Sequence, residues 1–132
     1  MPDLVLTLLG YVAAALGAVR AVPQWRRLRL LKDSSGVSPM TWTISVCSGI
    51  MWTAYSIAIL SPPLIIGTGI SLAGSAAVLV TLTRLRGGLR REWLLVAGTL
   101  ALTCIVAPIN AEVVGWAATT ASVIMRLPQL VM

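Results

Sequence analysis

Apolar residues dominate this chain in five long stretches, which short polar or glycine- and proline-containing segments separate. The stretches cover about Leu4–Val22, Pro39–Leu60, Pro62–Thr83, Trp93–Ile109 and Glu112–Met132. A helix needs about 20 apolar residues to cross the hydrocarbon core of a bilayer. The pattern therefore predicts an all-α membrane protein with five transmembrane helices embedded in the lipid bilayer.

Ser-Pro pairs mark the starts of the second and third predicted helices. Ser38 and Ser61 stand where a side chain can cap a helix, and Pro39 and Pro62 follow at the first helical position. A proline costs little there because its missing N–H would have no partner within the helix. We expect a short outer turn that makes these two helices an antiparallel pair.

Composition supports a membrane protein and argues against other classes. Hydrophobic residues make up 58% of the 132 residues and charged residues only 11%, whereas a soluble domain carries about 25% charged residues. Asp3 replaces the basic segment of a signal peptide, so the first stretch does not resemble a cleavable leader. The chain has no His, its two Cys lie singly in apolar stretches, and no nucleophile–base arrangement is present. The sequence thus indicates no enzyme, no metal and no cofactor.

The positive charges alternate between loops. Four lie between the first and second predicted helices (Arg26, Arg27, Arg29 and Lys32), and four between the third and fourth (Arg84, Arg86, Arg90 and Arg91). The other two connections hold no Lys or Arg. This is the positive-inside pattern, which places the N-terminus outside and both basic loops in the cytoplasm. A nucleic-acid site would instead gather its cations on one face. We therefore expect no nucleic-acid partner and a plasma-membrane location. A composition low in His and Lys and rich in Ala, Arg, Val and Leu favours a bacterial source with a GC-rich genome.

Two segments of the chain match each other without a gap. The matching pairs are Gly10 and Gly115, Ala13 and Ala118, Pro23 and Pro128, and Gln24 and Gln129. Internal repeats of this kind are typical of membrane transporters. Because four predicted crossings separate the copies, both point the same way. Three helices would form one unit, the fourth would restore the orientation, and the fifth would begin a second unit whose two further helices we would expect after Met132.

Each copy of the repeat ends in Pro-Gln. A proline inside a helix removes one backbone hydrogen bond, and in a bilayer the freed carbonyl must find another donor. Gln24 and Gln129 carry amide groups that can serve this purpose. We expect Pro23 and Pro128 to act as hinges at the cytoplasmic end, where they let a gate open. The alternative is that each proline only ends its helix at the interface.

Two arginines precede the Pro-Gln pairs inside apolar stretches. Arg20 and Arg126 have stems long enough to reach the cytoplasmic surface. Contact with a substrate or a lipid headgroup is the other interpretation.

Polar residues recur at helical spacing on the second and third predicted helices. They are Thr41, Ser45, Ser48, Trp52, Tyr55 and Ser56 on the second, and Thr68, Ser71 and Ser75 on the third. Hydroxyls and small residues also serve helix packing, which explains most of these positions. Trp52 differs because it lies near mid-membrane, where an indole can stack on a flat solute and donate a hydrogen bond; core packing is the alternative. No stretch has a carboxylate near its middle, which favours facilitated diffusion over ion-coupled transport.

Several short motifs resemble the PQ-loop superfamily, and most of all the SWEET and SemiSWEET sugar transporters. They are Gly10-Tyr11-Val12-Ala13-Ala14, Val22-Pro23-Gln24, Ser35-Gly36-Val37-Ser38, Met51-Trp52-Thr53-Ala54-Tyr55 and Pro62-Pro63. The resemblance implies three parts. Residues 1–86 would form a complete triple-helix bundle, 87–111 a basic loop and linker helix, and 112–132 the first helix of an incomplete second repeat.

The resemblance also implies roles for single residues. It places a cytoplasmic gate at the prolines, Tyr55 at an extracellular gate and Trp52 in a central pocket. In the sugar-transporting branch a pocket Asn stands where this chain has Thr68, whose hydroxyl offers fewer hydrogen bonds than an amide. We expect Trp52, Thr68 and Ser71 to bind the substrate. Other PQ-loop relatives carry amino acids or act as receptors, so the resemblance leaves the substrate open.

The leading hypothesis from the sequence is a SWEET-like transporter that moves a small polar solute, such as a sugar, by alternating access. Its pocket would need two bundles, supplied by a homo-oligomer or by another chain. The alternative is a non-transporting or truncated PQ-loop membrane protein that acts as an assembly partner or a receptor-like module.

Overall fold

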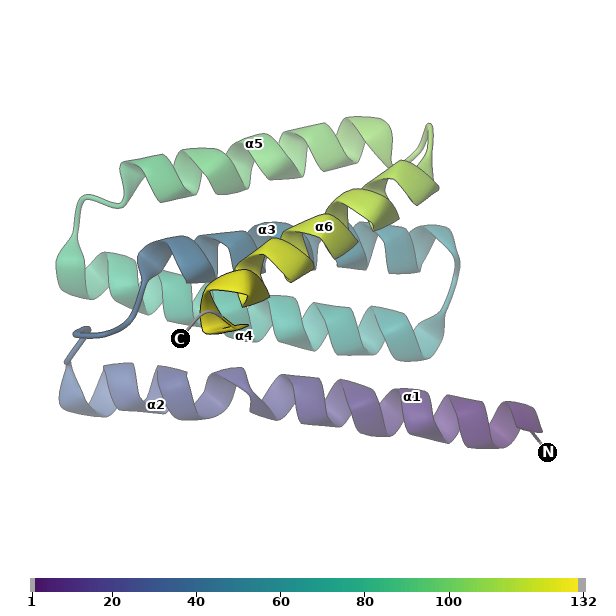
Figure 1. The fold of residues 1–132 in the computed structure, drawn as a ribbon, viewed down its shortest axis with the longest axis horizontal. Helices are drawn as coiled ribbons and strands as arrows, with labels where there is room; N and C mark the ends of the chain where they lie inside the picture. Colours follow the sequence, from purple (N-terminus) through teal and green to yellow (C-terminus); the bar gives the residue numbers. More distant parts are fainter. Residues whose placement is uncertain (1, 131–132) are drawn as a thin grey trace.

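Helices make up almost all of the computed structural model, which describes residues 2–130 (Figure 1). They are α1 (Pro2–Val19), α2 (Ala21–Leu31), α3 (Pro39–Ala58), α4 (Pro62–Arg86), α5 (Arg90–Val106) and α6 (Ala111–Leu130). Since α1 and α2 continue each other as one rod, the six helices correspond to the five predicted from the apolar stretches. The all-α prediction is confirmed. Two rods, Leu4–Leu31 and Pro62–Arg86, are long and apolar enough to cross a membrane.

The junction between α1 and α2 lies one turn before Pro23. α1 ends at Val19, and Arg20 keeps right-handed helical dihedral angles of φ −58° and ψ −39°. Pro23 lies four residues after Val19 and has no N–H to donate to the Val19 carbonyl. The helical hydrogen-bond ladder is therefore interrupted at this point, while the rod keeps its direction (Figure 1).

The two predicted Ser-Pro helix starts differ in the structure. The Ser38 hydroxyl accepts the N–H of Thr41 at 3.4 Å, with Pro39 opening α3 as expected. Ser61 occupies the corresponding position before Pro62, but its side chain makes no capping hydrogen bond. The prediction of a side-chain cap at Ser61 is wrong, because only the backbone of Ser61 takes part, its carbonyl accepting the N–H of Ile65 at 2.9 Å.

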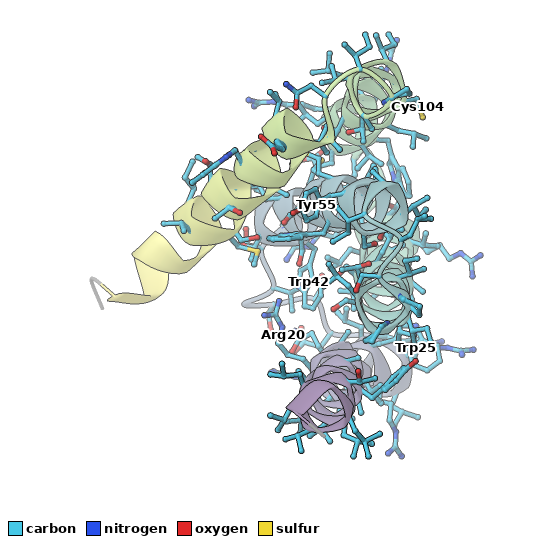
Figure 2. The ribbon with its side chains drawn as sticks, turned by 90° about the vertical axis from the view of Figure 1, so that its right-hand side faces the viewer. Arg20, Trp25, Trp42, Tyr55 and Cys104 are labelled. Atoms are coloured by element: carbon cyan, nitrogen blue, oxygen red, sulfur yellow. The ribbon has the colours of Figure 1, made fainter. Side chains whose placement is uncertain are left out.

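The helices pack in a row with α4 inside it. α4 contacts α1 and α2 on one side and α3 on the other, and α3 also contacts α5 and α6. The order across the row is thus α1/α2, α4, α3 and α5, as Figures 1 and 2 show. α6 crosses one face of this row diagonally and packs on α3. Consequently α6 stands out from the row and leaves a space between itself and α1.

Glycines on α4 allow the first rod to approach closely. A Cβ at Gly67 would lie 2.8 Å from the Cβ of Ala14, and a Cβ at Gly74 would lie 2.8 Å from the Cβ of Ala21. Both distances are too short for real carbon contacts, so neither position admits a side chain without movement. Small residues at helix contacts are typical of proteins in lipid, where helices associate by close packing.

The basic end of the row is closed by side-chain contacts between loops and helices. Arg86 of α4 donates from Nε to the Ser34 hydroxyl at 3.0 Å, and also to the Ser34 carbonyl. Trp93 of α5 donates its indole N–H to the Thr83 hydroxyl at 2.8 Å. In the same loop, hydrogen bonds from the side chain and backbone of Ser35 hold the pKa of Asp33 below its usual value. These contacts hold the connections at the end of the row where the cationic residues gather. Arg26, Arg27 and Arg29 themselves lie on α2, so the helix runs farther than the first apolar stretch predicts and only Lys32 is left in the connection.

Large apolar side chains remain exposed along the outer helices. Examples are Leu16 on α1, Leu102 on α5 and Trp116 on α6, with exposed fractions of 70%, 63% and 73%. An apolar surface of this extent is unusual for a soluble monomer. It fits a chain whose outer helices face lipid.

Candidate functional site

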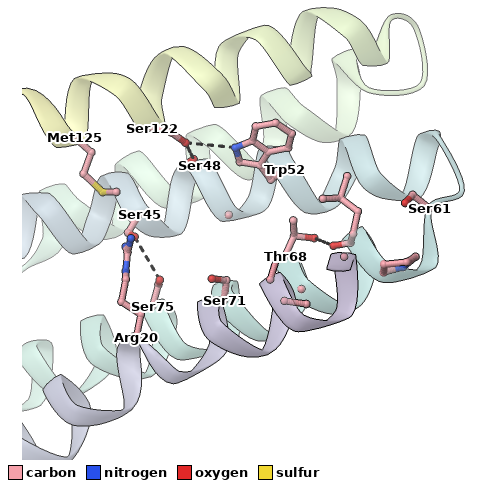
Figure 3. A pocket seen from close by; sticks show the side chains of 18 of the residues that line it. Arg20, Ser45, Ser48, Trp52, Ser61, Thr68, Ser71, Ser75, Ser122 and Met125 are labelled. Atoms are coloured by element: carbon pink, nitrogen blue, oxygen red, sulfur yellow. Dashed lines mark hydrogen bonds between the residues drawn. The ribbon is translucent and has the colours of Figure 1, made fainter. Parts of the chain in front are cut away.

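A cavity of about 720 Å³ lies between α1, α3, α4 and α6 (Figure 3). Its residues come from four walls: Leu6, Thr7, Gly10, Ala13, Ala14, Gly17 and Arg20 of the first rod; Ser45, Ser48, Gly49 and Trp52 of α3; Ser61, Pro63, Leu64, Gly67, Thr68, Ser71 and Ser75 around α4; and Ser122 and Met125 of α6. Cavities of this size commonly hold small organic ligands. In the described part of the lining, hydroxyls are combined with one indole and one guanidinium.

The wall formed by α1 is made mostly of small residues. Its lining positions recur every three or four residues, so they form one face of the helix. Gly10, Ala13, Ala14 and Gly17 have little or no side chain on that face. The cavity exists because this helix places no bulk opposite α3 and α6.

The two copies of the sequence repeat contribute matching positions to the cavity. By the alignment of Gly10 with Gly115, residue Gly17 corresponds to Ser122 and Arg20 corresponds to Met125. All four line the cavity, two from the first rod and two from α6. The two copies of the repeat therefore line the same cavity, one from the first rod and the other from α6.

Trp52 lines the cavity, but its N–H is already used. Nε1 donates to the Ser122 hydroxyl at 3.3 Å, and Ser122 in turn donates to the Ala118 carbonyl at 2.8 Å. The Ser48 and Ser122 hydroxyls lie 2.9 Å apart. This network joins α3 to α6. A ligand would meet the ring of Trp52 rather than its N–H.

Thr68 and Ser71 both line the cavity, and they differ in what they can offer a ligand. The Thr68 hydroxyl donates to the Leu64 carbonyl at 2.8 Å and lies 3.2 Å from the Ser56 hydroxyl. Ser71 makes no side-chain hydrogen bond to any described residue. It faces Gly17, where an added Cβ would lie 3.8 Å from its Oγ. Ser71 can therefore donate and accept, whereas Thr68 can only accept.

A second polar group lies at the end of the cavity near the α1–α2 junction. Ser75 donates to Ser45 at 3.4 Å, which links α4 to α3. The Arg20 side chain projects from the first rod into the cavity toward these helices (Figure 3). None of the described residues that line the cavity is acidic. The sequence had singled out Arg20 without deciding between the membrane surface and a ligand.

Three of the predicted gate residues, Pro23, Gln24 and Tyr55, lie outside the described cavity lining. Tyr55 is half-buried between α3 and α6, and its ring meets Trp52 edge-on, with centroids 5.8 Å apart and planes at 80°. Pro23 is exposed and Gln24 half-buried on α2. The side chains of Pro128 and Gln129, in the last turn of α6, lie outside the described residues. The gating roles stay predictions.

No metal site was found in the part of the chain that the structure describes, where no three His, Cys, Asp or Glu side chains come together.

Comparison with known proteins supports one family for the first half of the chain. Residues 5–65 match the family described as PQ loop repeat. The match covers α1, α2, α3 and the start of α4, and so includes Pro23-Gln24 and Trp52. Comparisons with curated proteins and with solved structures found no significant match. The match supports the PQ-loop superfamily, and together with the apolar helices it indicates a membrane protein.

Proposed function

We propose that this protein is an integral membrane transporter, similar to the SWEET proteins, that carries a small polar solute such as a sugar. The observation that carries the proposal is the cavity of about 720 Å³ between the two copies of the repeat. A polar solute that leaves water needs new hydrogen-bond partners in the membrane. The serine and threonine hydroxyls of α3, α4 and α6 supply them, and Trp52 supplies a flat apolar face.

The path of the solute would run along the first rod. We propose that the N-terminus lies outside, in the plasma membrane, with Tyr55 near the outer end of the cavity and the α1–α2 junction near its cytoplasmic end. The interrupted hydrogen-bond ladder before Pro23 is a point where α2 can tilt against α1 at low cost. Such a hinge would open the cytoplasmic end while the outer end stays closed. This is one step of alternating access, and it needs no coupled ion.

A second bundle would complete the transport site. Among the described residues α1 and α6 make no contact with each other. The side of the cavity between these two helices is therefore open. We propose that another copy of the chain, or another chain with the remaining helices, packs on this side. The assembly would then line the solute on all sides.

Uptake into proteoliposomes tests the proposal. Labelled glucose and sucrose are offered to the wild-type protein, to Trp52→Ala and to Trp116→Ala, a control that removes an exposed indole from the outer face of α6. We expect saturable uptake of at least one sugar, lost in Trp52→Ala and kept in Trp116→Ala. Uptake that both variants retain would remove Trp52 from the site.

A non-transporting PQ-loop protein, acting as an assembly partner or receptor-like module, is the second candidate. The observation that favours it is that the donors of Trp52 and Thr68 are satisfied within the protein. On this reading the polar groups join helices and serve no solute. Absence of uptake of any polar solute by folded, inserted protein would favour it.

A further inference from the structure

Among the described residues that line the cavity, one side chain is cationic, and nothing in the described structure neutralises it. Arg20 lines the cavity, and no acidic residue is among the described residues that line it. No hydrogen bond or ion pair joins its guanidinium to any described residue. An arginine in the membrane interior is costly unless it pairs with an anion or reaches water.

The position of Arg20 does not favour the membrane surface as its partner. Arg20 precedes Arg26, the first arginine of the basic cluster on α2, by six residues, or about 9 Å at the helical rise of 1.5 Å per residue. Side chains on a helix tilt toward its N-terminus, which is the outer end in the orientation proposed above. The stem of Arg20 therefore begins in the direction away from the cytoplasm, and Figure 3 shows it extending into the cavity.

The rest of the cavity fits a hydroxylated molecule with one anionic group. Ser45 and Ser75, whose hydroxyls are joined by a hydrogen bond of 3.4 Å, line the same cavity as Arg20, and Trp52 follows Ser45 by two turns along α3. At the repeat position that corresponds to Arg20, α6 places the uncharged Met125. The described lining thus offers a single planar cation at one side, free hydroxyl capacity at Ser71, and an aromatic ring beyond it.

We propose that the cavity selects a small hydroxylated anion, whose carboxylate or phosphate group binds Arg20 while its hydroxylated body lies between the serines and Trp52. The guanidinium fork matches both anionic groups in bidentate geometry, and such charge-assisted hydrogen bonds are about twice as strong as neutral ones. The inference rests on the proposed transport function, because it names the class of solute that the same cavity accepts.

Binding of matched sugars tests the inference. D-glucuronate and D-glucose differ in a carboxylate, and D-glucose 6-phosphate supplies the phosphate form. Each is titrated by calorimetry against the full chain in phosphatidylcholine nanodiscs. We expect at least one anionic sugar to bind about tenfold or more tightly than glucose, as a charged hydrogen bond predicts. Equal binding of all three, or tighter binding of glucose, would overturn the inference.

Three variants assign the preference to Arg20. Arg20→Gln should abolish the preference, and Arg20→Lys should weaken it without abolishing it, because an ammonium keeps the charge but loses the bidentate fork. Arg26→Gln, which removes an exposed arginine outside the cavity, should leave the preference unchanged. Circular dichroism and gel filtration confirm that each variant is folded. If Arg20→Gln fails to fold, the wild-type preference and the Arg20→Lys result still decide. A preference that survives in Arg20→Gln would overturn the inference.

Two further experiments are needed: one distinguishes a solute from a lipid headgroup as the ligand of Arg20, and the other distinguishes binding from transport. The first is native mass spectrometry, which measures the phosphatidylglycerol retained by the protein. Lipid retention that depends on Arg20, without binding of any anionic sugar, would overturn the inference. Uptake of the same probes into proteoliposomes is measured in parallel. Arg20-dependent binding without uptake supports the anion site while the proposed transport fails. If glucose uptake is saturable and unchanged in Arg20→Gln, and no anionic sugar is preferred, the proposed transport is supported and the inference is overturned.

Discussion

Gly115 of α6 lies directly against the ring of Tyr55 of α3. A Cβ added at Gly115 would stand 3.1 Å from both Cδ2 and Cε2 of the ring, which is closer than ordinary carbon contacts. Tyr55 in turn meets Trp52 edge-on. The approach of α6 to the first bundle therefore depends on the absence of a side chain at one position of the repeat.

Substitution of Gly115 should separate α6 from α3. We expect Gly115→Val to destabilise the protein by about 1–3 kcal/mol, the usual cost of overpacking a close contact. Gly98→Val is the matched control, since an added Cβ at Gly98 in α5 meets no atom within 4 Å. Thermal unfolding in detergent measures both. Equal shifts in the two variants would show that helix propensity, and not the Tyr55 contact, sets the effect.

The contact of α4 with the first rod gives a second prediction within one helix. Gly74→Ala should destabilise the protein by about 1–3 kcal/mol, because its new methyl group would meet Ala21 at 2.8 Å. Gly69→Ala, five residues earlier, adds the same group where nothing lies within 4 Å. There the gain in helix propensity should stabilise the protein by up to about 1 kcal/mol. We expect the melting temperature to fall in Gly74→Ala and to rise in Gly69→Ala, relative to the wild type. A higher melting temperature in Gly74→Ala would contradict the close contact.

Removal of Pro23 tests the hinge. Pro23→Ala restores an N–H for the Val19 carbonyl, so the free energy of unfolding should rise by up to about 3 kcal/mol. Uptake at saturating solute should fall, since α2 loses its freedom to tilt. Pro62→Ala is the control, because Pro62 opens α4 where no helical hydrogen bond is missing. If Pro23→Ala is more stable but its uptake is unchanged, the interruption of the helix before Pro23 is not needed for gating.

The two hydroxyls of α4 should differ in their effect on binding. Ser71→Ala removes a hydroxyl with no partner in the described structure, so the affinity for a transported solute should fall by about 0.5–1.5 kcal/mol. Thr68→Val removes a hydroxyl whose proton already goes to Leu64, and we expect a smaller loss. Solute titration of both variants measures the difference. A larger loss in Thr68→Val would reverse the assignment.

The sequence predicts the helices well because the apolar runs and their polar boundaries are local signals. It also selects Trp52, Thr68 and Ser71, which the structure brings to one cavity. Ser122 and Met125 were missed, since they join the cavity only through the crossing of α6 over α3. For the same reason the sequence could not reveal that the indole N–H of Trp52 is taken by Ser122. Local patterns report faces of helices, and hydrogen-bond partners depend on which faces meet.

The central place of α4 in the row has a consequence for biosynthesis. In the described residues the backbones of α1 and α2 lie against α4 and not against α3, although α3 is the next helix in the chain. The partner of the first rod is α4, which leaves the ribosome only after α3. During synthesis the N-terminal rod must therefore wait in the membrane, unpaired, until the third apolar segment has been inserted between it and its neighbour. A translocon or insertase that holds the first segment back would shorten this vulnerable interval.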